Sequence, residues 1–353
     1  MKLLFENWRK FLNEEEAQPG KVIFMAGAPG SGKSTVIEKL GLENMEIINP
    51  DEFYEPALEK AGLGKNVAQI RGDFKDARQE LKDLLGDKLK LEEPESGWSH
   101  DELVNMYQTA FGHVGNDRVA ANELTRAQEK YDATRQKCSL QAQCFVQAKR
   151  SAKEKQAVVS EEGKSFIIDG TGGQYGMIVN QKTELEKPLY QYTDEEGNII
   201  YTDKDSIQGK TVTLARGPYD TAMIFVDIPL EDAISRQQSR LQSGGRSLDL
   251  KAVEKSWNAV NKNLESYREL FGDNLFRIVA TDDEMDVSIA AEGERLSAFL
   301  GGLEEDFQSE LKPRLQKQMR RLLHGGGNQD SGPFSEKAPI DYRGSAPPGA
   351  PGG

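Results

Sequence analysis

Residues 22–40 read VIFMAGAPGSGKSTVIEKL, an apolar run followed by glycines and then by an amphipathic segment. A continuous apolar run such as 22–26 is typical of a parallel strand that is buried on both faces. The residues after it fit the pattern G-x-x-x-x-G-K-[ST] of a phosphate-binding loop. The pattern predicts that the whole loop binds a nucleotide, and its members are Gly27, Ala28, Pro29, Gly30, Ser31, Gly32, Lys33, Ser34 and Thr35.

The residue types of this loop match the chemistry of phosphate binding. Glycines let successive backbone N–H groups point at phosphate oxygens, and the helix that follows adds the positive end of its dipole. Lys33 would reach the β- and γ-phosphates, and the Ser34 hydroxyl would ligate Mg²⁺. A glycine-rich turn that matches by chance is the alternative, but the strand before it and the helix after it favour the loop. We therefore expect ATP and Mg²⁺ as ligands.

Strand and helix patterns alternate along the rest of the chain. Further strands are predicted at 45–48, 165–168, 221–226 and 275–279, a hairpin at 189–215, and helices from residue 33 and at 230–242, 249–271 and 287–323. Strands that alternate with helices indicate an α/β fold with a parallel sheet.

Residues 55–163 differ from the rest because they are polar, poor in strand patterns and too long for a connecting loop. They are predicted to be helical, with the longest helix near 117–160. The expected organisation is an N-terminal amphipathic segment at 1–18, a core at 19–55 and 164–285, a helical insertion at 56–163, C-terminal helices at 286–324 and a disordered Gly/Pro-rich tail at 325–353.

The composition excludes several classes of protein. The chain carries 45 Lys and Arg against 58 Asp and Glu, and this net charge of -13 argues against a general nucleic-acid coat. No apolar run approaches the roughly 20 residues that span a bilayer, and no secretory signal is visible, so a cytoplasmic location is expected. With 2 cysteines and 3 scattered histidines, the sequence offers neither a disulfide scaffold nor a zinc site.

Two aspartates follow predicted strands, where the carboxyl edge of a parallel sheet binds ligands. Asp51 could accept the proton of a hydroxyl that receives a phosphoryl group. Its alternative is a helix N-cap, and both roles could hold. Asp169 could hold Mg²⁺ or a water of its shell, and its alternative is a turn residue in Asp-Gly.

Arginines form a third group of candidates. Arg236 and Arg240 are four residues apart on one predicted helix, and Arg246 follows a Gly-Gly pair. A mobile segment that carries them could close over the phosphates and neutralise charge in the transition state. A solvated surface role is the alternative for each. Arg71 and Arg78 could bind an anionic acceptor, or they could be helix-surface charges balanced by nearby acids.

These motifs together resemble the P-loop kinases grouped with zeta toxins and polynucleotide 5′-kinases, and more distantly the adenylate kinase type. The residues that carry the resemblance are Gly27–Thr35, Ile48–Asp51, Ile167–Thr171, Phe225–Pro229, Arg236 and Arg240. The resemblance implies a three-layer P-loop NTPase sandwich with sheet order 2-3-1-4-5. It also implies that Asp51 is the base for the acceptor hydroxyl and that the arginines act in a lid. The helical insertion and the 189–215 hairpin depart from this pattern and leave the acceptor open.

Residues 3–14, LLFENWRKFLNE, resemble short leaders on proteins of large tailed bacteriophages. This resemblance implies a phage-encoded protein that acts in the host cytoplasm or is carried in the virion. The alternative is an amphipathic helix that docks on the kinase core or on a protein partner.

The expected activity is an ATP-dependent phosphotransferase, or kinase, that moves the γ-phosphoryl group to a hydroxyl of a nucleotide, a nucleic-acid end or a sugar nucleotide. The alternative is a nucleotide-binding switch or weak ATPase in an interaction or virion protein. Beyond ATP and the acceptor, a protein partner could bind residues 1–18 or the insertion. No membrane and no general nucleic-acid binding are expected.

Overall fold

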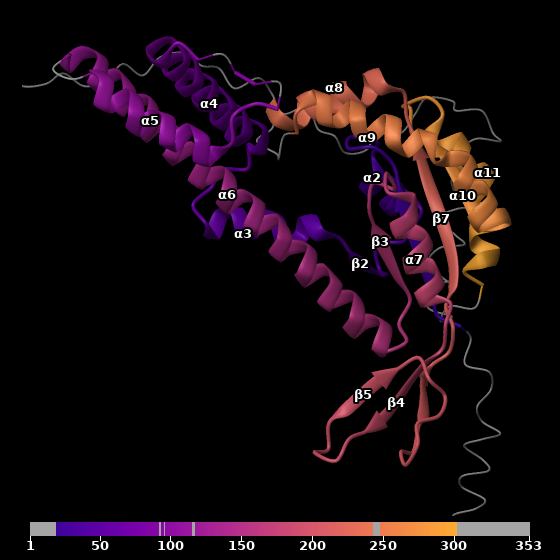
Figure 1. Ribbon diagram of the computed structural model, residues 1–353. Coiled ribbons are helices and arrows are strands. Elements are labelled where there is room, and N and C mark those ends of the chain that lie inside the picture. The colour runs from indigo at the N-terminus through magenta and orange to yellow at the C-terminus, as the bar shows by residue number, and fades with distance from the viewer. Residues whose placement is uncertain (1–18, 92, 95, 115–116, 243–247, 302–353) are drawn as a thin grey trace, which may run out of the picture.

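The computed structural model describes residues 19–91, 93–94, 96–114, 117–242 and 248–301 (Figure 1). The predictions for residues 1–18, for Arg246, for 302–324 and for the tail at 325–353 lie outside the described residues.

A parallel sheet of five strands forms the centre of the fold. Its members are β1 (Lys21–Ala26), β2 (Glu46–Ile48), β3 (Phe166–Asp169), β7 (Asp220–Asp227) and β8 (Leu275–Val279). All neighbours are parallel, and the spatial order is β2-β3-β1-β7-β8. Counted along the chain within this sheet, that order reads 2-3-1-4-5. The predicted α/β fold with a parallel sheet is confirmed.

Helices cover both faces of the sheet because side chains alternate along each buried strand. In β1, Ile23 and Met25 face a core shared with α2 (Lys33–Lys39) and α11 (Met285–Phe299). The alternate residues of β1 face a second core shared with α7 (Tyr175–Leu185), α10 (Leu264–Phe271) and the C-terminal part of α6 (Arg118–Glu161). The strands are therefore fixed from both sides, which makes their carboxyl ends a rigid platform.

The second half of the core contains α8 (Leu230–Gln242), α9 (Leu250–Lys262), α10 and the short 3-10 helix η1 (Gly272–Asn274). The prediction of a single helix at 249–271 is wrong, because the helix is interrupted at Asn263, between α9 and α10. The Asn263 side chain donates to the carbonyl oxygens of Gly172 and Gly173, both at 3.2 Å. The residue between the two helices therefore connects them to the segment that follows β3. No helix in the described part of the chain has the length and apolar character needed to cross a bilayer.

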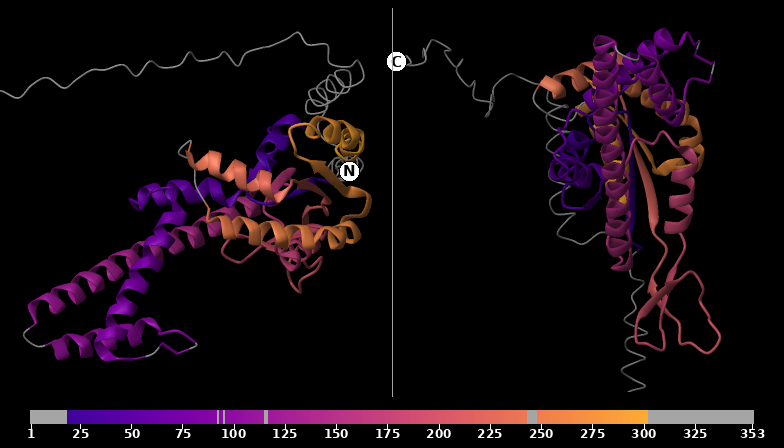
Figure 2. Two further views of the ribbon diagram at one scale, coloured as in Figure 1. Left: turned by 90° about the horizontal axis from the view of Figure 1, so that it is seen from above. Right: turned by 60° about the vertical axis from the view of Figure 1, so that its left-hand side comes forward.

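Between β2 and β3 the chain forms the helices α3 (Pro50–Lys60), α4 (Val67–Leu89), α5 (His100–Val114) and α6. The outer parts of α4, α5 and α6 share a hydrophobic cluster of their own, centred on Leu81, Leu124 and Tyr131. Nearer the sheet, α3 packs against α6 through a second cluster that includes Tyr54 and Cys144. Figure 2 shows these helices as an arm that extends away from the sheet.

Residues 189–216 form a small antiparallel sheet with order β5-β4-β6. The strands are β4 (Leu189–Thr193), β5 (Ile199–Thr202) and β6 (Thr213–Arg216), so the predicted hairpin is β4–β5 and the third strand was missed. The small sheet leaves the core after α7 and returns at the amino end of β7, where the Tyr219 amide donates to the Leu185 carbonyl at 3.0 Å. It therefore lies at the end of the molecule opposite the carboxyl ends of the parallel strands (Figure 1).

Candidate active site

The predicted phosphate-binding loop connects β1 to α2 at the carboxyl edge of the sheet. Two of its glycines have left-handed backbone angles, with φ of 85° at Gly30 and 87° at Gly32. The Gly27 amide donates to the Thr171 carbonyl at 3.0 Å, which ties the loop to the chain after β3. The Lys33 ammonium donates to the Gly27 carbonyl at 3.1 Å, so its side chain folds back over the loop.

The loop also packs closely under α8. A Cβ atom added to Gly30 would lie 2.6 Å from the Ala233 carbonyl oxygen and 3.3 Å from Cγ of Gln237. Only glycine fits there, because the position combines a left-handed backbone with contact to another helix. The loop conformation is thus fixed by both its own sequence and its neighbour.

We expect Gly30→Ala to lower the free energy of unfolding by about 2 kcal/mol and to weaken ATP binding, because the added methyl group must displace a backbone carbonyl and adopt a strained φ. Urea denaturation of the purified protein measures the first effect. The matched control is Gly64→Ala, since Gly64 has open space around its Cβ position and no positive φ. Equal stability of the two variants would contradict the described packing of the loop.

Lys33, Asp51 and Asp169 form one electrostatic cluster. Burial lowers the pKa of Lys33, while the nearby carboxylates of Asp169 and Asp51 raise it by a smaller amount. Burial likewise raises the pKa of Asp169, Lys33 opposes this shift, and Asp51 adds to it. A desolvated cation beside two carboxylates is typical of a site that handles charged groups.

Asn49, which the sequence analysis named only within the motif Ile48–Asp51 and without a role, connects the two aspartates. Its Oδ1 accepts the Asp51 amide at 2.8 Å, and its Nδ2 donates to Asp169 Oδ2 at 2.9 Å. Asn49 is the N-cap of α3, and Asp51 lies in the first turn of that helix. The alternative of Asp51 as N-cap is therefore wrong, and its carboxylate is not needed for that role. The pair Asn49-Pro50 was the available signal, because Asn at N-cap followed by Pro at N1 is a common helix start.

The residues at the loop fit a divalent cation that is also held by phosphate. Asp169 Oδ1 is buried and has no hydrogen-bond partner among the described residues, while Oδ2 is held by Asn49. Ser34 is exposed in the first turn of α2. The described residues contain no group of three or more His, Cys, Asp or Glu side chains suited to a metal. Magnesium would thus depend on Ser34, Asp169 and phosphate oxygens, the donors it prefers.

Of the three predicted arginines, Arg236 and Arg240 are described. Arg236 Nη2 donates to the Ala280 carbonyl at 2.7 Å and pairs with Asp282 at 3.2 Å. Its other terminal nitrogen, Nη1, would lie 3.1 Å from a Cβ atom on Gly32, so its guanidinium borders the loop. Arg240 lies 3.7 Å from Glu55 of α3 and contributes to the electrostatics of Lys33. Both arginines are near the loop, and Arg240 links α8 to α3.

The two candidate arginines of the helical insertion, Arg71 and Arg78, form hydrogen bonds within the insertion. Arg71 donates to Gln141 at 3.4 Å, and Arg78 donates to the Trp98 carbonyl at 2.5 Å. These contacts join α4 to α6 and to the segment before α5. They favour the interpretation of both residues as parts of the arm rather than as an acceptor site.

The loop after β3 is held in place by residues that the sequence did not indicate. Tyr267 donates its hydroxyl to the Gly172 carbonyl at 2.5 Å, alongside the bonds from Asn263. Burial raises the pKa of Tyr267 to about 12, so this donor keeps its proton. A Cβ atom on Gly172 would lie 2.6 Å from that of Ala26. These contacts fix Thr171 beside the start of the phosphate-binding loop.

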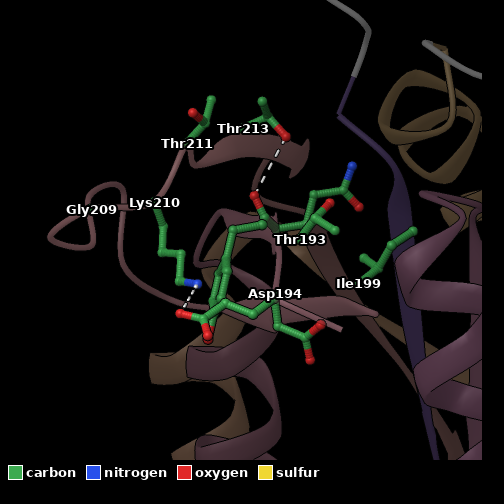
Figure 3. A pocket seen from close by; sticks show the side chains of 10 residues that line it. Thr193, Asp194, Ile199, Gly209, Lys210, Thr211 and Thr213 are labelled. Atoms are coloured by element: carbon green, nitrogen blue, oxygen red, sulfur yellow. Dashed lines mark hydrogen bonds and ion pairs between the residues drawn. The ribbon is translucent and has the colours of Figure 1, made fainter. Parts of the chain in front are cut away.

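A separate cavity of about 520 Å³ lies on the small sheet, lined by Gln191–Glu195, Ile199, Gly209–Thr211 and Thr213 (Figure 3). Lys210 and Glu195 form an ion pair of 3.7 Å at its edge. The cavity is at the opposite end of the molecule from the loop, so it takes no part in this site.

No protein-family model matches the chain, and no curated protein matches it. Among solved structures, the chain is similar to one described as "putative kinase" from Chloroflexus aurantiacus j-10-fl. The two share 12% sequence identity with a TM-score of 0.36, over 79% of this chain and 99% of that chain. A likeness at this level carries no argument about activity.

Proposed function

We propose that this chain is a P-loop kinase of the three-layer type, which transfers the γ-phosphoryl group of ATP to a hydroxyl acceptor. The observation that supports the proposal most is the single cluster formed by the Gly27–Thr35 loop, Lys33, Asp51 and Asp169. Phosphoryl transfer depends on positioning and on charge stabilisation rather than on covalent chemistry by the protein. A fixed loop with a partly buried cation at the sheet edge provides both.

Each residue then has a defined task. The amides of residues 30–35 and the Lys33 ammonium bind the phosphates. Bound Mg²⁺, held by Ser34 and Asp169, would shield the charge of the phosphate oxygens. Asp51 accepts the proton of the acceptor hydroxyl, and Arg236 and Arg240 approach the phosphates from α8. Arg246 is proposed for the same group.

The arm is the part of the fold that we assign to the acceptor. Asp51 belongs to α3, and α3 packs against α6 through Tyr54 and Cys144. The small sheet is remote from Asp51, so the hairpin that departs from the family pattern does not shape the acceptor site. We propose that the acceptor enters between α3 and α8 and is a nucleotide, a nucleic-acid end or a sugar nucleotide.

The test is incubation of the full-length protein with Mg²⁺ and ATP labelled at the γ-phosphate, together with nucleosides, 5′-hydroxyl oligonucleotides and UDP-sugars. Label should appear on at least one acceptor, which would also name the acceptor class. Label found only as free phosphate would favour the switch or weak-ATPase alternative. Retention of all label in ATP would contradict catalysis with this panel altogether.

A further inference from the structure

Among the polar side chains of the described residues that are more than nine-tenths buried, two carry an atom without a hydrogen-bond partner, and both lie at the phosphate-binding loop. The buried polar or charged residues are Lys21, Ser31, Gln141, Thr221 and Gln237. Lys21 pairs with Asp220, Thr221 donates to Glu186, and Gln141 bonds to Tyr54 and Arg71. The two exceptions are Ser31 Oγ and Gln237 Oε1, which have no hydrogen-bond partner among the described residues.

Gln237 touches the loop from α8. Its Cγ would be 3.3 Å from a Cβ atom on Gly30, and its side chain is only 4% exposed. The adjacent Arg236 lies over Gly32, so one turn of α8 covers both left-handed glycines of the loop. A leucine or methionine would fill the same volume without burying a polar group. Proteins retain unpaired buried polar groups chiefly where function compensates for their cost.

We propose that Gln237 is a positioning residue for the phosphate-binding loop, pairing its carboxamide with the Gly30–Ser31 segment when the loop holds phosphates. This inference rests on the proposed function, because it requires a loop that binds a triphosphate. It gives α8 a direct link to nucleotide binding, since the same helix carries Arg236 and Arg240. The sequence contains no local signal for this role, as Gln237 lies in a polar stretch between Arg236 and Gln238.

The test compares Gln237→Met with Gln238→Met, a matched control on the same helix at an exposed position. Titration calorimetry with Mg·ATP and with Mg·tripolyphosphate gives affinities, and thermal unfolding gives stability. For Gln237→Met we expect both ligands to bind roughly ten-fold more weakly, about 1.4 kcal/mol. Its melting temperature should be unchanged or higher, because an unpaired amide is removed. The control should match the wild type in every measurement.

Three results would overturn the inference. Wild-type affinity in Gln237→Met would leave the residue a packing role only. Weaker binding together with a lower melting temperature would indicate a structural defect. Loss of ATP affinity with unchanged tripolyphosphate affinity would place Gln237 at the nucleoside rather than the loop. Failure of the wild-type protein to bind either ligand would instead contradict the proposed function.

Discussion

Replacing Lys33 with alanine should lower phosphoryl transfer by at least about 100-fold, the usual effect of removing one preorganised donor from a site of developing charge. The carboxylates of Asp169 and Asp51 act electrostatically on the Lys33 ammonium, and its desolvation leaves that charge poorly screened. Without it, the phosphates would face two carboxylates with no compensating ammonium. Initial rates with labelled ATP, measured beside circular dichroism of the variant, give the effect and check the fold.

The control for this prediction is Lys39→Ala, at the other end of α2. Lys39 forms an ion pair with Asp286 at 2.7 Å, with both side chains at least 36% exposed. It is remote from the loop glycines, so its loss should change the rate little. A Lys33→Ala variant that folds and keeps wild-type activity would exclude the loop as the catalytic phosphate site.

Replacing Asp51 with asparagine should leave ATP binding within about two-fold of the wild type but lower transfer by roughly 10² to 10⁴, the range for loss of a general base. The substitution preserves shape and keeps the backbone amide that Asn49 accepts. It removes only the carboxylate that would take the acceptor proton. Calorimetry with Mg·ATP and single-turnover transfer measure the two effects separately.

Glu52→Gln provides the comparison, since Glu52 is the next residue of α3 and lies 3.5 Å from Lys155. It removes a carboxylate of the same helix turn and should retain most of the transfer activity. Equal losses in the two variants would show that the negative charge of the helix start matters in general and that Asp51 is not the base.

The parts of the fold that local signals define could be predicted from the sequence. The β1 strand, the loop and the start of α2 follow from an apolar run, glycines and an amphipathic segment, and α8 has the predicted bounds of 230–242. β6 was missed because Thr213–Arg216 is exposed along much of its length and has no alternation of apolar residues. The interruption at Asn263 was missed because the contact that Asn263 makes there is with Gly172, 91 residues earlier in the chain.

The candidate site shows the same division between local and tertiary information. Residues 27–35 and the two aspartates could be identified because each follows a strand at a recognisable position. Asn49 had a local signal that was overlooked. Tyr267 and Gln237 could not be identified, because their importance comes from what they touch: the Gly172 carbonyl and the Gly30 segment. Contacts of this kind are invisible in a single sequence.

The most direct test of the account is a crystal structure of the full-length protein with Mg²⁺ and a non-hydrolysable ATP analogue. We expect the β- and γ-phosphates on the Gly27–Thr35 loop in contact with Lys33, the metal beside Ser34 and Asp169, and Asp51 facing the γ-phosphate. Gln237 should then be paired with the Gly30–Ser31 segment. An analogue bound elsewhere, for example in the cavity of the small sheet, with the loop free of phosphate, would contradict the account.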